Sequence, residues 1–153
     1  SRGAARVVMV EHDRVAFRSL SEAKNLVGAA RVELVFDDAF HYLGETRERF
    51  DVVVLDPPAF IKRRKDARKG EQAYQRINTL AMELVADGGV LVSASCSHHL
   101  SRDALRGVLL RASRDLRRDL QLLEEGGQGP DHPVHPAIPE TSYLKTFFGR
   151  VLD

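Results

Sequence analysis

The feature that most constrains the fold of this 153-residue chain is the alternation of short apolar runs with amphipathic stretches. Apolar, β-rich runs occupy 6–10, 32–36, 50–55, 90–94, 120–123 and 143–151. Between them, apolar residues recur every three or four positions, which predicts helices over 14–27, 39–43, 73–84 and 102–116. We expect Asp13 and Ser101 to cap two of these helices and Gly28 to end the first. Strands that alternate with helices predict an α/β fold with a mostly parallel sheet, to which the last strand returns antiparallel.

The composition fits one soluble domain, with 43% hydrophobic and 29% charged residues. No apolar run approaches the roughly 20 residues of a membrane span, so we expect no membrane partner. A single cysteine cannot form an internal disulfide, which favours a cytoplasmic location.

Polar or chemically distinctive residues follow four of the predicted strands. In parallel α/β sheets, ligands bind beyond the carboxyl ends of the strands. The four places are Glu11, Asp37-Asp38, the segment Asp56 to Phe60, and the segment Ser95 to His98. We therefore expect these four places to surround one crevice.

Two of these places carry carboxylates suited to a nucleoside. Glu11 can accept two hydrogen bonds from a ribose diol, although it could equally be a solvated turn residue. Asp38 can accept a hydrogen bond from an adenine amino group. Either Asp37 or Asp38 could instead cap the following helix, and both roles can coexist in the pair.

The segment Asp56-Pro57-Pro58-Ala59-Phe60 predicts a rigid corner, because proline fixes the backbone and cannot extend a central strand. Such a corner can hold Asp56 against the edge of a flat heterocycle. Phe60 can stack on an extruded base, or it can belong to the core.

Cys96 directly follows the fourth strand, in Ser95-Cys96-Ser97. A lone cysteine is usually a buried structural residue, but at a strand end facing the same crevice as Asp56 its thiolate can act as a nucleophile. His98 and His99 are near enough in sequence to perturb its ionisation. Nothing in the sequence identifies either histidine as a general base.

The run Lys62-Arg63-Arg64-Lys65, continued by Arg68-Lys69, predicts a basic loop directly after this corner. It can be a solvated loop, but next to a catalytic corner it also suits binding to a nucleic-acid backbone. His132 and His135 in the proline-containing segment 131–136 lack a third metal ligand, so we expect a rigid loop over the crevice and no metal site.

Taken together, these blocks resemble the large-subunit (23S) ribosomal RNA cytosine-C5 methyltransferases. Residues 50–60 resemble that family's motif IV, and the helix start at 73–78, Ser95-Cys96-Ser97, Asp131-His132-Pro133-Val134 and Tyr143-Leu144-Lys145 follow in the family's order. The resemblance implies a Rossmann-like class I methyltransferase that uses S-adenosylmethionine and methylates carbon 5 of a cytosine in 23S rRNA.

The same resemblance implies roles for individual residues. Cys96 would add to carbon 6 of cytosine and Asp56 would hold the ring near N3. Glu11, Asp38, Asp56 and Pro57 would contact the cofactor, and Phe60 with Lys62, Arg63, Arg64 and Lys65 would contact RNA. Pro57-Pro58 departs from a second branch of RNA cytosine-C5 methyltransferases that carries Pro-Cys there, so no second thiol exists and the base that removes the carbon 5 proton is unidentified.

The family's first strand and its glycine-rich turn have no counterpart before Arg6. We therefore expect residues 1–153 to be a partial catalytic domain, truncated at the N-terminus. By itself it should be inactive, bind the cofactor weakly, and expose strand edges through which copies could associate. Two other functions stay open: methylation of a base amino group, which needs no thiol, and a non-catalytic RNA-binding or assembly role.

Overall fold

The computed structural model describes residues 3–23 and 31–153. The chain divides into two compact units, which we treat separately: an N-terminal unit, Ser1–Thr46, and a C-terminal unit, Arg47–Asp153. No helix of the described residues is long and apolar enough to cross a membrane.

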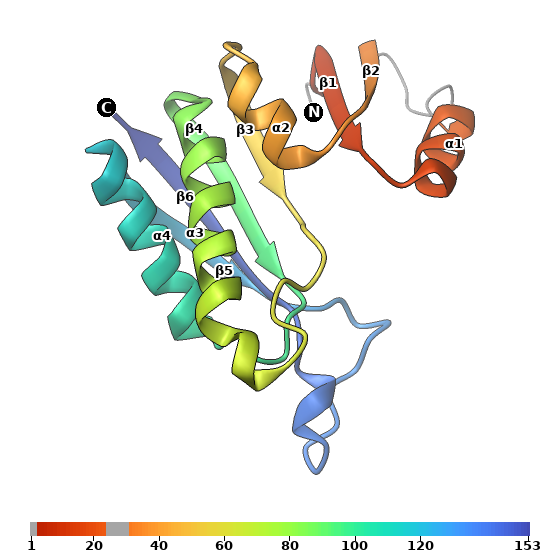
Figure 1. Ribbon diagram of the computed structural model, residues 1–153, viewed down its shortest axis with the longest axis vertical. Coiled ribbons are helices and arrows are strands. Elements are labelled where there is room, and N and C mark those ends of the chain that lie inside the picture. Colours follow the sequence, from red (N-terminus) through yellow and green to blue (C-terminus); the bar gives the residue numbers. More distant parts are fainter. Residues whose placement is uncertain (1–2, 24–30) are drawn as a thin grey trace. The chain divides into compact units, whose positions relative to one another are not determined.

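The N-terminal unit contains two parallel strands and two helices (Figure 1). Strands β1 (Arg6–Glu11) and β2 (Arg31–Phe36) pair from Arg6 opposite Arg31 to Glu11 opposite Phe36. Helix α1 (Arg14–Ala23) follows β1, and α2 (Ala39–Glu45) follows β2.

The predicted cap of α1 is confirmed. Asp13 Oδ1 accepts hydrogen bonds from the backbone N–H groups of Val15 and Ala16, both at 2.9 Å. These two bonds stabilise the carboxylate and lower the pKa of Asp13. The expected continuation of this helix through Val27 to Gly28 lies outside the described residues.

The C-terminal unit contains a four-stranded sheet in the order β3-β4-β6-β5. Its strands are β3 (Phe50–Leu55), β4 (Val85–Ser95), β5 (Asp119–Gly126) and β6 (Lys145–Leu152). β3 and β4 are parallel, whereas β6 is antiparallel to both β4 and β5. The predicted α/β class with an antiparallel C-terminal strand is therefore confirmed.

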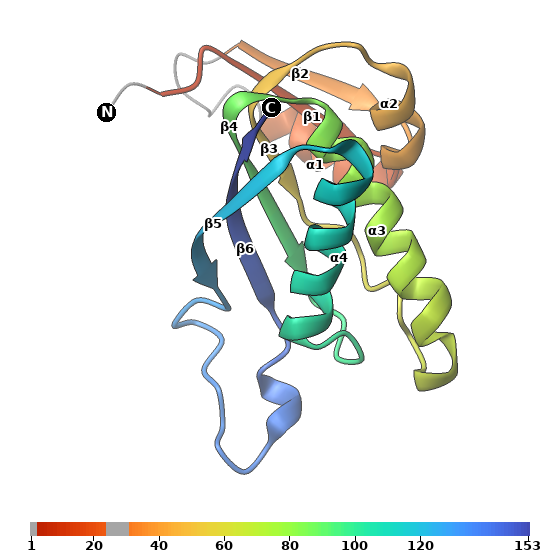
Figure 2. The same cartoon turned by 90° about the vertical axis from the view of Figure 1, so that its left-hand side faces the viewer.

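Helices α3 (Ala67–Glu83) and α4 (Arg102–Leu116) cover one face of this sheet, as Figures 1 and 2 show. Their buried side chains recur at helical spacing and meet alternate residues of the strands. The fully buried core includes Tyr74, Ile77, Met82, Leu91, Leu105, Val108, Phe147 and Val151. Ser101 caps α4 as predicted, because its Oγ accepts a hydrogen bond from the Ala104 N–H at 3.1 Å. Two short 3-10 turns, Arg64–Asp66 and Pro139–Thr141, complete the unit.

The largest differences between the structure and the sequence prediction are at the starts of β4 and α3, and smaller ones are at the end of β5 (Gly126) and the start of β6 (Lys145). β4 begins at Val85, before the expected start at residue 90, and the register with β3 shifts where Gly88 adopts a φ of +76°. A Cβ on Gly89 would lie 2.9 Å from the Asp51 carbonyl oxygen, so glycine permits this close pairing. α3 begins at Ala67, so Arg68 and Lys69 lie on a helix and the prediction of a basic loop through Lys69 was wrong.

Candidate active site

The corner at Asp56 and the loop at Cys96 lie at the same edge of the C-terminal sheet. β3 and β4 are parallel neighbours, and Leu55 pairs with Ser93. Asp56 therefore leaves β3 at the level at which β4 ends in Ser95, immediately before Cys96. The Asp56 side chain is exposed, and that of Cys96 is half-buried. Asp56 and Cys96 therefore both follow strands that end at one edge of the sheet.

The Tyr74 hydroxyl joins the two strand ends. Tyr74 is a fully buried residue of α3, and its hydroxyl accepts a hydrogen bond from Ser95 Oγ at 2.8 Å. The backbone N–H of Phe60 donates to the same oxygen at 3.4 Å. One phenol therefore contacts the end of β4 and the proline corner after β3.

Electrostatics also place this phenol beside both reactive groups. Burial raises the pKa of Tyr74, and the negative charges of Cys96 and Asp56 act in the same direction. The hydrogen bonds from Ser95 and Phe60 oppose this rise. The phenol therefore stays neutral at physiological pH and acts as a hydrogen-bonding group for Ser95 and Phe60.

Ser97 forms a second link between the two strand ends. Its buried hydroxyl donates to the Ile61 carbonyl oxygen at 3.0 Å, and its backbone N–H donates to Ser95 Oγ at 3.1 Å. Every polar group of this link is satisfied within the protein, which favours a single conformation of the loop. The segments on either side of Cys96 are thereby tied to the corner that carries Asp56.

Gly70 lets the first turns of α3 approach this corner closely. A Cβ at position 70 would lie 2.2 Å from Ile61 Cγ1 and 3.2 Å from the Phe60 carbonyl oxygen. Only a glycine leaves room for Ile61, which is itself 1% exposed. The close approach of α3 to this corner therefore requires a glycine at position 70.

Phe60 was predicted either to stack on a base or to belong to the core, and its position fits parts of both roles. Its ring centroid is 4.7 Å from that of Tyr74, with the planes tilted by 53°. Its side chain is nevertheless only half-buried. The ring thus packs against Tyr74 while part of the side chain remains exposed.

The basic residues Lys62, Arg63, Arg64 and Lys65 are all exposed. They lie between the corner and α3, partly in the 3-10 turn Arg64–Asp66. Arg63 Nε lies 3.7 Å from Asp66 Oδ2, a weak exposed ion pair. The structure therefore leaves this segment accessible directly beside the edge that carries Asp56.

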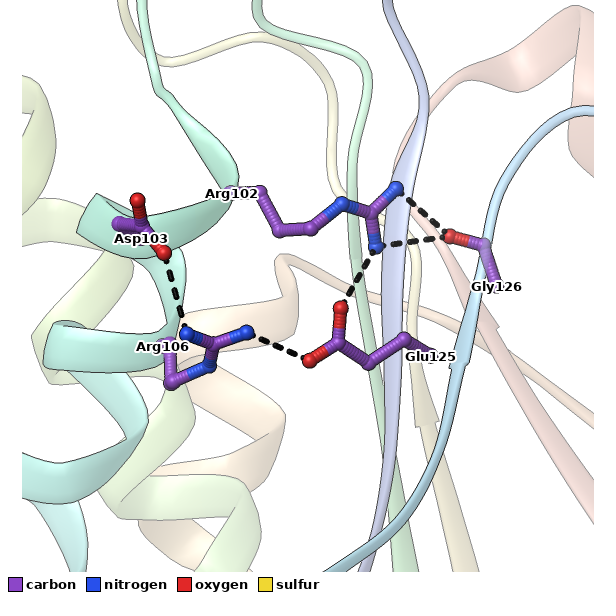
Figure 3. Close-up of polar contacts among 5 residues, drawn as sticks. All are labelled: Arg102, Asp103, Arg106, Glu125 and Gly126. Carbon is purple, nitrogen blue, oxygen red and sulfur yellow. Dashed lines mark hydrogen bonds and ion pairs between the residues drawn. The ribbon is translucent and has the colours of Figure 1, made fainter.

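The first turn of α4, which follows the Cys96 loop, is anchored to the end of β5 (Figure 3). Arg102 donates two hydrogen bonds to the Gly126 carbonyl oxygen, both at 3.1 Å, and lies 3.6 Å from Glu125. Arg106 bridges Glu125 at 2.6 Å and Asp103 at 3.1 Å. The loop from Cys96 to Ser101 is thus held at both ends.

The two carboxylates predicted to bind a nucleoside share one edge of the N-terminal sheet. Glu11 pairs with Phe36, and the Asp37 N–H donates to the Glu11 carbonyl oxygen at 3.3 Å. Glu11 Oε1 accepts the Asp13 N–H at 2.7 Å. Asp38 caps α2, because its Oδ1 accepts the N–H groups of Phe40 and His41 at 2.9 and 3.2 Å. The capping role that the sequence left open for Asp38 is therefore real.

The sequence prediction missed Tyr74 and Lys145 as members of the site. Tyr74 and Lys145 each stood in a block that supported the family resemblance, but nothing in the local pattern showed that they meet the Cys96 loop. His98 and His99, the two histidines that follow Cys96, are exposed, and their ring centroids are 5.6 Å apart. In the predicted rigid loop, the Tyr143 hydroxyl and His132 Nδ1 lie 3.3 Å apart.

Comparisons with known proteins agree with this architecture. A family model described as "Conserved hypothetical protein 95" matches residues 1–69. The ribosomal RNA large subunit methyltransferase I of Escherichia coli O1:K1 is 35% identical over 98% of this chain, and that of Citrobacter koseri is 38% identical over 84%. The chain spans only 39% and 33% of these two relatives.

Solved structures share the fold at lower identity. SMU.776, provisionally assigned as a methyltransferase and solved with SAH, matches 97% of this chain and 40% of its own, with a TM-score of 0.79 and 18% identity. A methyltransferase homologue from Pyrococcus horikoshii matches 94% of this chain and 52% of its own, with a TM-score of 0.68 and 21% identity. The chain therefore has the Rossmann-like fold of these methyltransferases, as predicted, and is similar over nearly its whole length to the ribosomal RNA large subunit methyltransferase I proteins.

Proposed function

We propose that this chain forms part of an S-adenosylmethionine-dependent methyltransferase that modifies carbon 5 of a cytosine in large-subunit ribosomal RNA, with Cys96 as the nucleophile. The observation that carries the proposal is the shared edge at which Asp56 and Cys96 lie, joined by the Tyr74 hydroxyl. The similarity to ribosomal RNA large subunit methyltransferase I proteins supports the substrate class.

Carbon 5 of cytosine is a poor nucleophile, and addition of a thiolate to the ring makes it more reactive. The Cys96 thiolate adds to carbon 6, and the electron pair of the carbon 5–carbon 6 double bond becomes available at carbon 5. Asp56 holds the ring near N3 and stabilises the change in charge there. After methylation, a base removes the proton from carbon 5, and the carbon 6–sulfur bond breaks to restore both the double bond and the thiolate.

S-adenosylmethionine, when bound, supplies the electrophilic methyl group. Residues of the N-terminal unit fit its nucleoside part. Glu11 and Asp38 lie at one edge of the sheet, and in each residue one carboxylate oxygen accepts hydrogen bonds from backbone N–H groups. Among the described residues, no N–H group donates a hydrogen bond to the second oxygen of either carboxylate, so that oxygen can accept one from a ribose hydroxyl or an adenine amino group.

The proposed contact with RNA uses two further features of the C-terminal unit. The half-buried Phe60 ring offers a stacking surface for a base turned out of its helix. Lys62, Arg63, Arg64 and Lys65 offer exposed positive charge for the phosphates of the flanking nucleotides. Pro57, which is buried, fixes the backbone between β3 and these residues and would border the cofactor with Asp56.

Covalent trapping tests this mechanism in the complete enzyme. With S-adenosylmethionine and RNA carrying 5-fluorocytosine at the target, we expect a stable protein–RNA adduct, because the fluorine on carbon 5 cannot leave as a proton does. Cys96→Ser should abolish both the adduct and methylation. Methylation that survives this substitution at the full rate would exclude Cys96 as the nucleophile and would favour methylation of a base amino group.

A further inference from the structure

Lys145 is a charged residue buried in the C-terminal unit. It begins β6, pairs with Ser95 at the end of β4, and is 7% exposed. Its ammonium group donates hydrogen bonds to the carbonyl oxygens of Ser97 and Leu100, at 2.5 and 2.8 Å. Lys145 therefore holds both ends of the turn that follows Cys96.

Both of these hydrogen-bond acceptors of the ammonium group are neutral carbonyl oxygens. Removing an ammonium group from water is unfavourable, and two carbonyl dipoles offset this loss of hydration less well than a carboxylate does. Arg102, the nearby cation on α4, instead has Glu125 as its counterion (Figure 3). A buried cation without a carboxylate indicates that another anion belongs beside it.

Cys96 directly precedes the turn that Lys145 holds. Burial lowers the pKa of Lys145, a negatively charged Cys96 raises it again, and the charge of Arg102 lowers it. Coulomb attraction is mutual, so an ammonium group that is stabilised by the thiolate also stabilises the thiolate.

We propose that Lys145 is a positioning residue that fixes the turn after Cys96 and places its positive charge beside the Cys96 sulfur. The role bears on catalysis only through the proposed function, in which the Cys96 thiolate attacks carbon 6. The effect of the charge itself requires neither cofactor nor RNA.

Other groups around Cys96 would act alongside Lys145. The Tyr74 hydroxyl approaches from α3, and Asp56 lies at the end of β3, where its negative charge disfavours a second anion. His98 and His99 lie on the same loop and are exposed. Among the described residues, Lys145 is the buried cation of this group, which makes its effect separable by substitution.

Alkylation of the chain's single cysteine tests the proposal directly, because every modified thiol is Cys96. The rate of reaction with iodoacetamide is measured from pH 5 to pH 10 by mass spectrometry. Lys145→Met should move the midpoint of this profile to higher pH by about one unit, so that modification near neutral pH becomes roughly tenfold slower. Lys145→Arg, which keeps a cation, should restore most of the difference.

Arg150→Met is the matched control, because it removes an exposed cation from the same strand. It should leave the profile unchanged. A Lys145→Met variant that is folded by circular dichroism and has the wild-type profile would overturn the proposal. So would an equal shift in the Arg150→Met variant.

A second measurement needs no variant and covers the case in which Lys145→Met does not fold. A cation beside the thiol attracts the anionic reagent iodoacetate and so raises its rate of alkylation relative to that of the neutral iodoacetamide. The ratio of their rates with the native chain should exceed the ratio with the denatured chain severalfold. An equal or smaller ratio would overturn the proposal, whatever the outcome of the methylation assay.

Discussion

The two units differ sharply in how completely they bury their side chains. In the described residues of the N-terminal unit no side chain is fully buried, and β1 and β2 form a sheet of only two strands. The C-terminal unit has a core where its sheet packs on α3 and α4, and the residues buried there include Tyr74 and Phe147, both at 0% exposure. Two-stranded sheets are marginal in water, whereas a multistranded sheet packed on helices has a core of its own.

The proposed reactive residues lie on the unit with the larger core, and the proposed contacts with the nucleoside part of the cofactor lie on the other unit. Asp56 and Cys96 lie on the unit with a core, where a hydroxyl network holds their backbone segments together. Glu11 and Asp38 lie on the unit without one, where the local contacts are capping bonds and a strand pair. The rigid part of the molecule thus carries the residues whose mutual placement the reaction needs most.

The largest expected effect contrasts one phenylalanine from each unit. Phe147→Ala, in β6, should lower the free energy of unfolding by about 3–5 kcal/mol, because it empties a fully buried position. Phe36→Ala, in β2, should cost less than about 1 kcal/mol, because that side chain is 49% exposed. Urea unfolding followed by circular dichroism measures both. Equal losses would contradict the contrast between the units.

A smaller effect compares two glycines on helices. Gly70→Ala should cost about 1–3 kcal/mol, because the new methyl group would collide with Ile61 at the corner. Gly44→Ala should be neutral or stabilising by up to about 1 kcal/mol, because nothing lies within 4 Å of its Cβ and alanine favours a helix. Thermal unfolding of the two variants checks this. A cost for Gly44→Ala that matches that of Gly70→Ala would show that helix propensity, not the corner contact, decides the result.

The smallest expected effect is a pH dependence confined to the N-terminal unit. The hydrogen bond between His41 Nδ1 and Asp37 Oδ2, at 2.8 Å, raises the pKa of His41 and lowers that of Asp37. The contribution of His41 is therefore lost as the pH rises through its raised pKa. That of Asp37 is lost as the pH falls through its lowered pKa. Hydrogen exchange of the α2 amides should be slowest between these two values.

His41→Asn serves as the control for this pH dependence, because it removes the titrating ring and retains a polar side chain. Exchange of the α2 amides should then no longer accelerate as the pH rises through the former pKa of His41, once the intrinsic pH dependence is removed. An unchanged profile would assign the effect to another group. Amides of β4 and β6 should show no such dependence in either protein, since the pair lies in the other unit.

Much of the fold followed from local pattern. Apolar runs and capping residues located the strands and most helices. The pattern of burial and the hydrogen bonds that cap a helix both involve residues that are close together in the sequence. The start of α3 was missed, because its basic first turn has no apolar periodicity and its position depends on Gly70 meeting Ile61. The start of β4 was missed because a glycine with positive φ lies inside the strand.

The sequence by itself determined which residues stand at the strand ends, and therefore that Asp56 and Cys96 would emerge at one edge of a parallel pair. Only the tertiary structure decided what surrounds them. Tyr74, Ser97 and Lys145 reach Cys96 or its neighbours from α3, the loop itself and β6, across as many as 48 positions of sequence. Such contacts depend on how helices and strands pack in three dimensions, and no spacing along the chain encodes them.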